Sequence, residues 1–275
     1  MKKTNFITLL ILGITVVLVV ALASWRSIEK DIDKPMESTY ENSNDLETNS
    51  TTPTSSIQED ISSNETGTEM ENSNISNIQP ASMSDALFIG DSRTVGIMEY
   101  AGLTEANYFC DVGMNVFKIK KECVSVPAVG KVTLDELLSN KKYGKIYVML
   151  GINEIGYPFQ SVIDKYSDLI EYIEVKQPDA TIFIQANLHV SKKRSDSDSS
   201  VNNKAINKLN LELSKFANNK NIFSMDANCL FDDKDGNLSA DKTSDNVHLY
   251  AKYYVEWGEW ICKETAKNLR RTALD

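Results

Sequence analysis

The chain has 275 residues and a formal net charge of −10, most of which comes from one stretch. Residues 27–80 hold 12 acidic side chains and 2 lysines, whereas from Ala81 onward 27 acidic residues are offset by 24 basic ones. A folded part so close to neutral lacks the basic surface that nucleic-acid binding requires, so we expect no nucleic-acid partner.

The N-terminus combines a short basic segment with a long apolar one. Lys2 and Lys3 precede residues 6–23, about 18 uncharged residues, which is enough to span a bilayer. The positive flank predicts that the rest of the chain lies outside the cytoplasmic membrane. Ala21-Leu22-Ala23 also resembles a cleavage site, so residues 1–26 are a retained signal-anchor, which we favour, or a removed signal peptide. The expected location is the cell membrane, through one N-terminal helix, or the exterior after leader cleavage.

Residues 27–82 are rich in Ser, Thr, Asn and Glu and contain few large apolar side chains. Such a composition buries too little surface to offset the entropy of ordering the chain, which predicts a disordered acidic linker. A poorly patterned second domain is the alternative interpretation. Residues 83–275 then form a single folded domain, which is long enough for an adequate core.

From residue 83 onward, short apolar runs alternate with longer amphipathic ones, a pattern typical of buried strands and helices in turn. The expected strands are Ala86–Ile89, Asn107–Asp111, Lys145–Leu150, Ala180–Ala186 and Asn221–Asp226. The expected helices are Thr94–Tyr100, Thr133–Ser139, Phe159–Lys176, Val201–Asn218 and Ala251–Arg270. Five strands separated by helices predict an α/β fold, a three-layer αβα sandwich around a parallel sheet.

Two of the expected helices show a face that should be buried. An apolar stripe with helical spacing is formed by Val162, Ile163, Tyr166, Leu169, Ile170 and Ile173. The last helix carries a group of aromatic residues, namely Tyr250, Tyr253, Tyr254, Trp257 and Trp260. Their spacing of three and four favours core packing against the sheet over an aromatic binding surface.

A strand-to-helix turn is expected at Gly90-Asp91-Ser92, where the apolar run from Ala86 to Ile89 stops. Ser92 would lie at the carboxyl edge of the sheet, where open α/β sheets bind their ligands. Its hydroxyl would be exposed and its backbone N–H would lie at a helix N-terminus, which favours negative charge. Alone, the tripeptide is also typical of an ordinary helix N-cap.

Two further strand ends carry groups that could meet a ligand. Asn153, in Gly151-Ile152-Asn153, follows the strand expected at 145–150 and offers an amide donor to a developing oxyanion. Gly113 follows the strand expected at 107–111, and a glycine there lets a backbone N–H approach a ligand closely. Turn geometry alone would also explain both residues.

The chain contains two histidines, and one of them has an acidic partner nearby in the sequence. Asp245 precedes His248 by three residues, so its carboxylate can orient the imidazole, which can then act as a general base toward a serine. His189 has no carboxylate near it in the sequence, and we interpret it as part of a loop or pocket wall.

Metal and cofactor motifs are missing from the sequence, and we expect neither a metal nor an organic cofactor. The four cysteines (Cys110, Cys123, Cys229 and Cys262) show no CxxC spacing and have no histidine companions, which argues against zinc. They could form two disulfides or remain free thiols. Asp233-Lys234-Asp235-Gly236 hints at a calcium loop, but Phe231 and Lys242 occupy ligand positions of that motif, which favours a turn.

Taken in order, Gly90-Asp91-Ser92, Gly113, Gly151-x-Asn153 and Asp245-x-x-His248 resemble the SGNH (GDSL-type) hydrolase superfamily, in a membrane-exported bacterial form. The resemblance covers about residues 86–261, and it implies a flavodoxin-like fold with a five-stranded parallel sheet. It also implies a catalytic triad of Ser92 as nucleophile, His248 as base and Asp245 as supporting acid. The implied oxyanion-hole donors are the Ser92 N–H, the Gly113 N–H and the Asn153 side chain.

Three other positions of these motifs receive an interpretation. The family often has Asp after Gly-x-Asn, whereas this chain has Glu154, a departure that affects the geometry of the loop rather than a catalytic role. Asp91 is interpreted as structural, holding the turn. Arg93 is left open between a substrate contact and a surface ion pair.

The resulting hypothesis is an extracytoplasmic serine esterase that removes short acyl groups, O-acetyl above all, from cell-envelope carbohydrate or another small ester. The alternatives are an O-acetyltransferase that uses the same serine ester, a lysophospholipase or thioesterase, and an inactive binding module. The sequence leaves open the natural acyl group and acceptor, the leader's cleavage and the oligomeric state.

Overall fold

The computed structural model describes residues 79–272. The signal-anchor or signal peptide expected at 1–26, and all but the end of the linker expected at 27–82, lie outside these residues. Within 79–272, none of the helices combines the length and apolar character needed to cross a bilayer.

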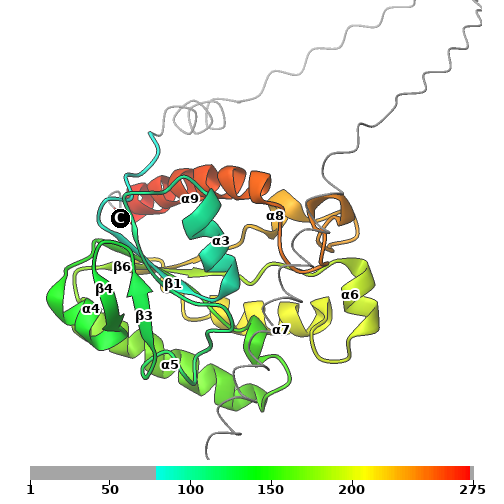
Figure 1. Ribbon diagram of the computed structural model, residues 1–275, viewed down its shortest axis with the longest axis horizontal. Coiled ribbons are helices and arrows are strands. Elements are labelled where there is room, and N and C mark those ends of the chain that lie inside the picture. The colour runs from blue at the N-terminus through cyan, green and yellow to red at the C-terminus, as the bar shows by residue number, and fades with distance from the viewer. Residues whose placement is uncertain (1–78, 273–275) are drawn as a thin grey trace, which may run out of the picture. The chain divides into compact units, whose positions relative to one another are not determined.

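A five-stranded parallel sheet forms the centre of the domain (Figure 1). Its strands are β1 (Ala86–Gly90), β2 (Asn107–Cys110), β5 (Lys145–Met149), β6 (Thr181–Gln185) and β7 (Ile222–Met225). They are arranged in the order β2-β1-β5-β6-β7, and every neighbouring pair is parallel. The order reverses at β1, and such a switch point creates a crevice at the carboxyl ends of the strands. The expected flavodoxin-like sandwich is confirmed.

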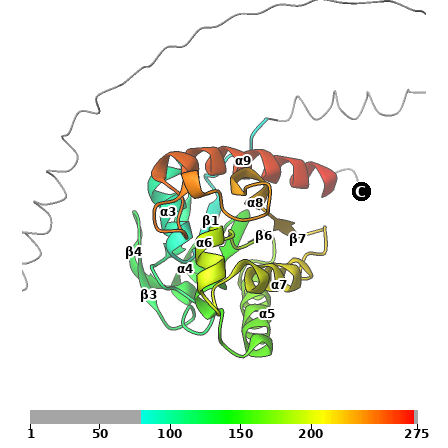
Figure 2. The ribbon, with the colours of Figure 1, turned by 90° about the vertical axis from the view of Figure 1, so that its right-hand side faces the viewer.

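Helices cover both faces of this sheet, as Figures 1 and 2 show. One layer contains α3 (Ser92–Tyr100), α8 (Asn228–Phe231) and α9 (Ala251–Thr272). The opposite layer contains α4 (Leu134–Asn140), α5 (Phe159–Lys176) and α7 (Asn203–Ser214). The short α6 (Lys192–Ser197) and the 3₁₀ turns η1 (Ile152–Glu154) and η2 (Ala240–Lys242) lie in connections. All five expected strands and all five expected helices are present, with ends that differ by a few residues.

Each face of the sheet has its own apolar core. The face under α4, α5 and α7 buries the predicted stripe of α5, in which only Ile163 is half-buried rather than buried. The face under α3 and α9 buries Tyr254 and Trp257, while Tyr250 is exposed. Most of the aromatic group on α9 therefore packs as core, as predicted.

Four short elements were not expected from the sequence. The antiparallel hairpin of β3 (Cys123–Val126) and β4 (Gly130–Thr133) lies beside the sheet rather than in it. The helices α6 and α8 have six and four residues. Such short segments carry too little apolar periodicity to be recognised against loop sequence.

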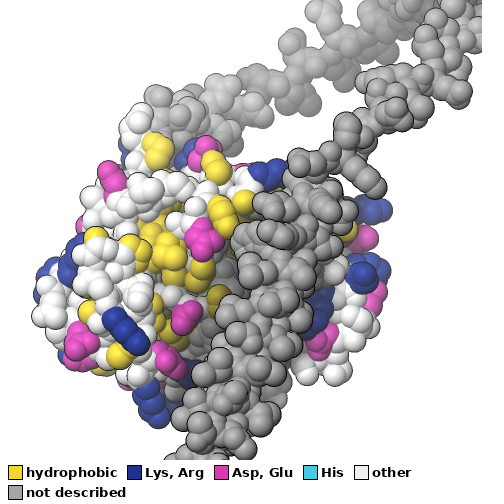
Figure 3. All heavy atoms as spheres, viewed as in Figure 1, with side chains coloured by type: hydrophobic (Ala, Val, Ile, Leu, Met, Phe, Trp, Pro, Cys, Tyr) yellow, Lys and Arg dark blue, Asp and Glu magenta, His cyan; other side chains and the backbone are white. Residues whose placement is uncertain are grey.

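The surface of the domain carries charges of both signs. On the face seen in Figure 3, acidic and basic side chains are interspersed, in line with the near-neutral charge of this part.

All four cysteines are free thiols, with Cys110 buried and both Cys123 and Cys229 exposed. Of the two states that the sequence left open, the structure has free thiols.

Candidate active site

Ser92 lies just after the carboxyl end of the interior strand β1, at the edge where it was predicted, and it is the first residue of α3. Asp91 is the N-cap of that helix, and its Oδ1 accepts a hydrogen bond from the N–H of Arg93 at 3.0 Å. Only glycine fits at position 90, because a Cβ there would lie 2.0 Å from Oγ1 of Thr94 and 2.6 Å from the Met149 carbonyl oxygen. The tight turn presents the half-buried Ser92 to the crevice.

The three residues predicted as a triad are in contact. Oγ of Ser92 donates to Nε2 of His248 at 2.9 Å, and Nδ1 of His248 donates to Oδ2 of Asp245 at 2.7 Å. The other oxygen of Asp245 accepts the backbone N–H of His248 at 2.8 Å and that of Val247 at 2.9 Å. This hydrogen-bond pattern orients the imidazole so that its basic nitrogen points at the serine.

The pKa of Asp245 is lowered, as expected for a carboxylate that stays charged beside His248. Partial burial acts to raise the pKa of this carboxyl, but its hydrogen bonds with His248 and Val247 outweigh burial and hold the pKa well below its usual value. The side chains of His248 and Asp245 are 40% and 51% exposed. The carboxylate therefore stays ionised, and the site is open to solvent.

Contacts from other segments hold the loop that carries His248. Asn246 has a left-handed backbone with φ of 72°, its carbonyl oxygen accepts the N–H of Ser191, and its side-chain oxygen accepts the Ser191 hydroxyl at 2.9 Å. On the other side, Nη2 of Arg93 reaches the carbonyl oxygen of Val247 at 3.5 Å. The loop that carries His248 is thus anchored both to α3 and to the connection after β6.

Arg93 and Asp91, the residues on either side of Ser92 in the sequence, are both buried and carry opposite charges. Arg93 is only 1% exposed, so the surface ion pair considered for it is wrong. Burial lowers the pKa of Arg93 and raises that of Asp91, and their opposite charges counteract both shifts. The structural interpretation of Asp91 agrees with its capping contact, and Arg93 acts on the site from within the core.

Gly113 and Asn153 follow the two strands that flank β1 in the sheet. Gly90 at the end of β1 pairs with Cys110 of β2 on one side and Met149 of β5 on the other. Gly113 is exposed with φ of +76°, a conformation that favours glycine. The structure places both residues at the same edge as Ser92, and their role as oxyanion donors remains a prediction.

Two contacts join the loop after β2 to the turn after β5. Nδ2 of Asn153 donates to the carbonyl oxygen of Met114 at 2.9 Å. The next residue, Glu154, is 1% exposed, and its Oε1 accepts the N–H of Val116 at 2.7 Å. Burial raises the pKa of Glu154 to about 7. Its effect on loop geometry was expected from the sequence, whereas its burial was not.

His189 lies in a loop, as interpreted from the sequence, and the fold also brings an acidic partner to it from a distant part of the chain. Its Nδ1 lies 2.7 Å from Oδ2 of Asp232 and its Nε2 lies 2.7 Å from Oδ1 of Asn207. Asp232 is 43 positions away along the chain, so only the folded structure brings the two together. Within the described residues this pair makes no contact with Ser92, and it holds a buried loop rather than a nucleophile.

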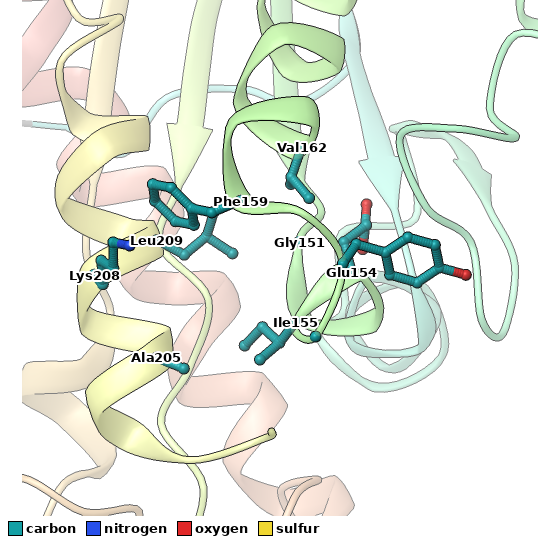
Figure 4. A pocket seen from close by; sticks show the side chains of 10 residues that line it. Gly151, Glu154, Ile155, Phe159, Val162, Ala205, Lys208 and Leu209 are labelled. Atoms are coloured by element: carbon teal, nitrogen blue, oxygen red, sulfur yellow. The ribbon is translucent and has the colours of Figure 1, made fainter. Parts of the chain in front are cut away.

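A cavity of about 170 Å³ opens at the same edge of the sheet, between α5 and α7. Figure 4 shows its largely apolar walls, to which Ile155, Phe159 and Leu209 contribute. Glu154 also lines it, and Nζ of Lys208 lies 3.9 Å from the centre of the Phe159 ring. The cavity thus borders the turn that carries Asn153.

Comparisons with known structures find the same fold in other proteins. A proposed acylhydrolase from Bacteroides fragilis is similar over 76% of this chain and 99% of its own, with a TM-score of 0.51 and 11% identity. A GDSL-like lipase from Bacteroides thetaiotaomicron is similar over 73% and 97%, with a TM-score of 0.50 and 14% identity. No protein-family model and no curated protein matches the sequence. The likeness concerns the fold, and this chain has the fold of SGNH hydrolases.

Proposed function

We propose that this protein is a serine esterase of the SGNH type, which hydrolyses short acyl esters, O-acetyl groups above all. The observation that carries the proposal is the continuous chain of hydrogen bonds from Ser92 through His248 to Asp245. It lies at the switch point of a parallel sheet, where such folds bind their ligands. A binding module would have no physical need for this arrangement of nucleophile, base and acid.

The reaction proceeds through an ester of Ser92. Nε2 of His248 takes the hydroxyl proton as Oγ attacks the ester carbonyl, and Asp245 stabilises the imidazolium that forms. The predicted donors, which are the N–H groups of Ser92 and Gly113 and the Asn153 amide, hold the oxyanion. His248 then gives its proton to the departing alcohol, and water activated by the same nitrogen releases the carboxylic acid.

The substrate class is proposed from the openness of the site and from the N-terminal sequence. With His248 and Asp245 both partly exposed, the triad can reach an ester that protrudes from a large polymer. An exported enzyme on an N-terminal anchor and a long acidic linker would meet cell-envelope carbohydrate, and we place it outside the cytoplasmic membrane for that reason. Acetylated glycans are therefore the proposed substrates.

The test is hydrolysis of aryl esters of increasing acyl length by the purified full-length protein, beside Ser92→Ala and His248→Ala. Fast release of acetate that falls with chain length and is lost in both variants is the expected result. A preference for long acyl chains would point to lipid esters instead, and acylation of an added sugar in place of acetate release would indicate a transferase.

A serine-directed phosphonate serves as the control for the choice of model ester. It should label Ser92 in the wild-type protein and leave the folded Ser92→Ala variant unlabelled. If the folded wild-type protein neither turns over any ester nor takes the label, the proposed esterase function is wrong.

A further inference from the structure

The turn η1 (Ile152–Glu154), which follows β5, contacts the loop after β2 at two points. Within this turn, the side chain of Asn153 holds the carbonyl oxygen of Met114, and that of Glu154 holds the N–H of Val116. Gly113 immediately precedes the first of these points. The two groups predicted to bind the oxyanion, the Gly113 N–H and the Asn153 amide, therefore lie on segments joined by two contacts, one of which is made by Glu154.

Glu154 is an unexpected residue for a purely structural bridge. Its side chain is almost wholly buried, and burial raises its pKa to about 7. Hydrogen bonding from the backbone N–H groups of Val116, Glu154 and Gly151 opposes this rise. Within the described residues, Oε2 itself has no partner at hydrogen-bond distance. A buried polar atom without a partner is unfavourable, so an apolar side chain would stabilise this turn better if packing were its only role.

The first oxygen of Glu154, Oε1, is a hydrogen-bond acceptor, which an apolar side chain lacks. Oε1 accepts the Val116 N–H at 2.7 Å, a short contact typical of a strong hydrogen bond to a carboxylate. Val116 is itself 5% exposed, so without this acceptor its N–H would be left buried and unpaired, and the loop would shift to satisfy it. That shift would displace Gly113, three residues earlier.

We propose that Glu154 is a positioning residue of the esterase site, which sets the separation between the Gly113 N–H and the Asn153 amide through its contact with Val116. The proposal rests on the esterase function proposed above. It differs from the interpretation made from the sequence, in which Glu154 affected only the shape of its own loop. The role depends on the length of the side chain and on an acceptor oxygen at its end.

Three substitutions separate these requirements in the full-length protein. Glu154→Gln keeps both the length and an acceptor oxygen, Glu154→Asp keeps the carboxylate but is one methylene shorter, and Glu154→Ala keeps neither. Glu256→Ala removes an exposed glutamate on α9 and serves as the matched control. Steady-state kinetics on an aryl acetate and thermal unfolding are measured for each protein.

We expect kcat to fall by about 100-fold in Glu154→Ala and Glu154→Asp, because displacing a catalytic group by about 1 Å has an effect of that order. KM should change little, since the lost contact is one to the transition state rather than to the bound ester. Glu154→Gln should stay within a few-fold of the wild-type protein, and Glu256→Ala should match it.

A folded Glu154→Ala or Glu154→Asp with wild-type kcat would overturn the proposal, as would Glu154→Gln losing as much activity as Glu154→Ala. If Glu154→Ala does not fold, the comparison of the Asp and Gln variants decides. Failure of the esterase function itself is recognised separately, because the wild-type protein would then show neither turnover nor label at Ser92, and both proposals would fall together.

Discussion

Asn153 shows how an exposed side chain can be oriented before a substrate arrives. Its amide nitrogen carries two hydrogens, and one of them is directed at the carbonyl oxygen of Met114. This contact fixes the plane of the amide and leaves the second hydrogen for a ligand. A donor held in place in advance needs no reorganisation during the reaction, which is what makes oxyanion stabilisation effective.

Asn153→Ala should therefore reduce kcat for aryl acetate by about 100- to 1000-fold, the usual loss when one oxyanion donor is removed. The side chain is exposed, so thermal unfolding should change little. Asn140→Ala, at another exposed asparagine, is the control and should leave both quantities unchanged. Near-full activity in a folded Asn153→Ala protein would remove this residue from the oxyanion hole.

At the scale of single residues, the sequence predicted the candidate site residues that lie within short motifs. Ser92, Asp245 and His248 were predicted from their motifs, and the structure brings them into contact. The sequence did not predict that Arg93 is buried. It also did not predict the contact between Glu154 and Val116, because these residues are 38 positions apart. Spacing within a motif is visible in a sequence, whereas burial at a loop depends on what the fold brings against it.

Among the elements, the connection after β6 is unusual because it is a buried loop. Every residue of 186–191 is buried, so its backbone groups need partners inside the protein. Asparagine side chains supply them: Oδ1 of Asn210 accepts the Asn187 N–H, Oδ1 of Asn228 accepts that of His189, and Oδ1 of Asn203 accepts that of Val190. This loop in turn holds the segment that carries His248, through Ser191 and Asn246.

His189 makes the stability of this loop dependent on pH. Burial acts to lower its pKa, but the hydrogen bonds to Asp232 and Asn207 outweigh burial and raise the pKa above its ordinary value of about 6.5. A raised pKa in the folded state means that the charged ring stabilises the protein below about pH 6.5 and that this stabilisation is lost as the pH rises through the folded-state value.

His189→Gln should accordingly lower the free energy of unfolding more at pH 6 than at pH 9. Urea unfolding of both proteins at the two pH values measures this difference. Lys192→Ala, an exposed residue in the neighbouring helix α6, provides the comparison at the same pH values. Equal destabilisation by His189→Gln at pH 6 and pH 9 would show that the ring acts only by packing.

The hairpin of β3 and β4 marks the limit of prediction from sequence at this scale. Both strands have four residues, and the burial of β3 alternates between exposed and buried positions. Their turn contains Ala128 with φ of 61°, where the usual signals for a turn would be glycine or asparagine. Long helices and buried central strands were predicted well because their periodicity extends over many residues or their apolar runs are unbroken.

In the described domain as a whole, a row of aromatic rings crosses all five strands on the face under α3 and α9. The rings come from residues that pair in register across the sheet, namely Tyr108, Phe88, Tyr147, Phe183 and Phe223. Neighbouring ring centroids lie 5.2, 4.3, 4.9 and 5.8 Å apart. The hydroxyl of Tyr147 also lies 2.7 Å from Oγ1 of Thr265 and so connects the row to α9.

A break in this row should destabilise the domain as one unit, because sheet register and the seating of α9 both depend on it. Phe183 is wholly buried between two ring neighbours, so Phe183→Ala should lower the free energy of unfolding by about 3–5 kcal/mol. Val175→Ala, at a side chain that is 79% exposed on α5, should change it by less than about 0.5 kcal/mol.

Urea unfolding monitored both by tryptophan fluorescence and by far-ultraviolet circular dichroism tests this cooperativity. Trp257 of α9 is buried in the same core as the aromatic row, whereas circular dichroism reports on the helices of both layers. The two transitions of Phe183→Ala should move together to lower urea, since both layers pack on the same five strands. A fluorescence transition that shifts alone would mean that α9 detaches from an intact sheet, and the aromatic row would then hold one layer rather than the domain.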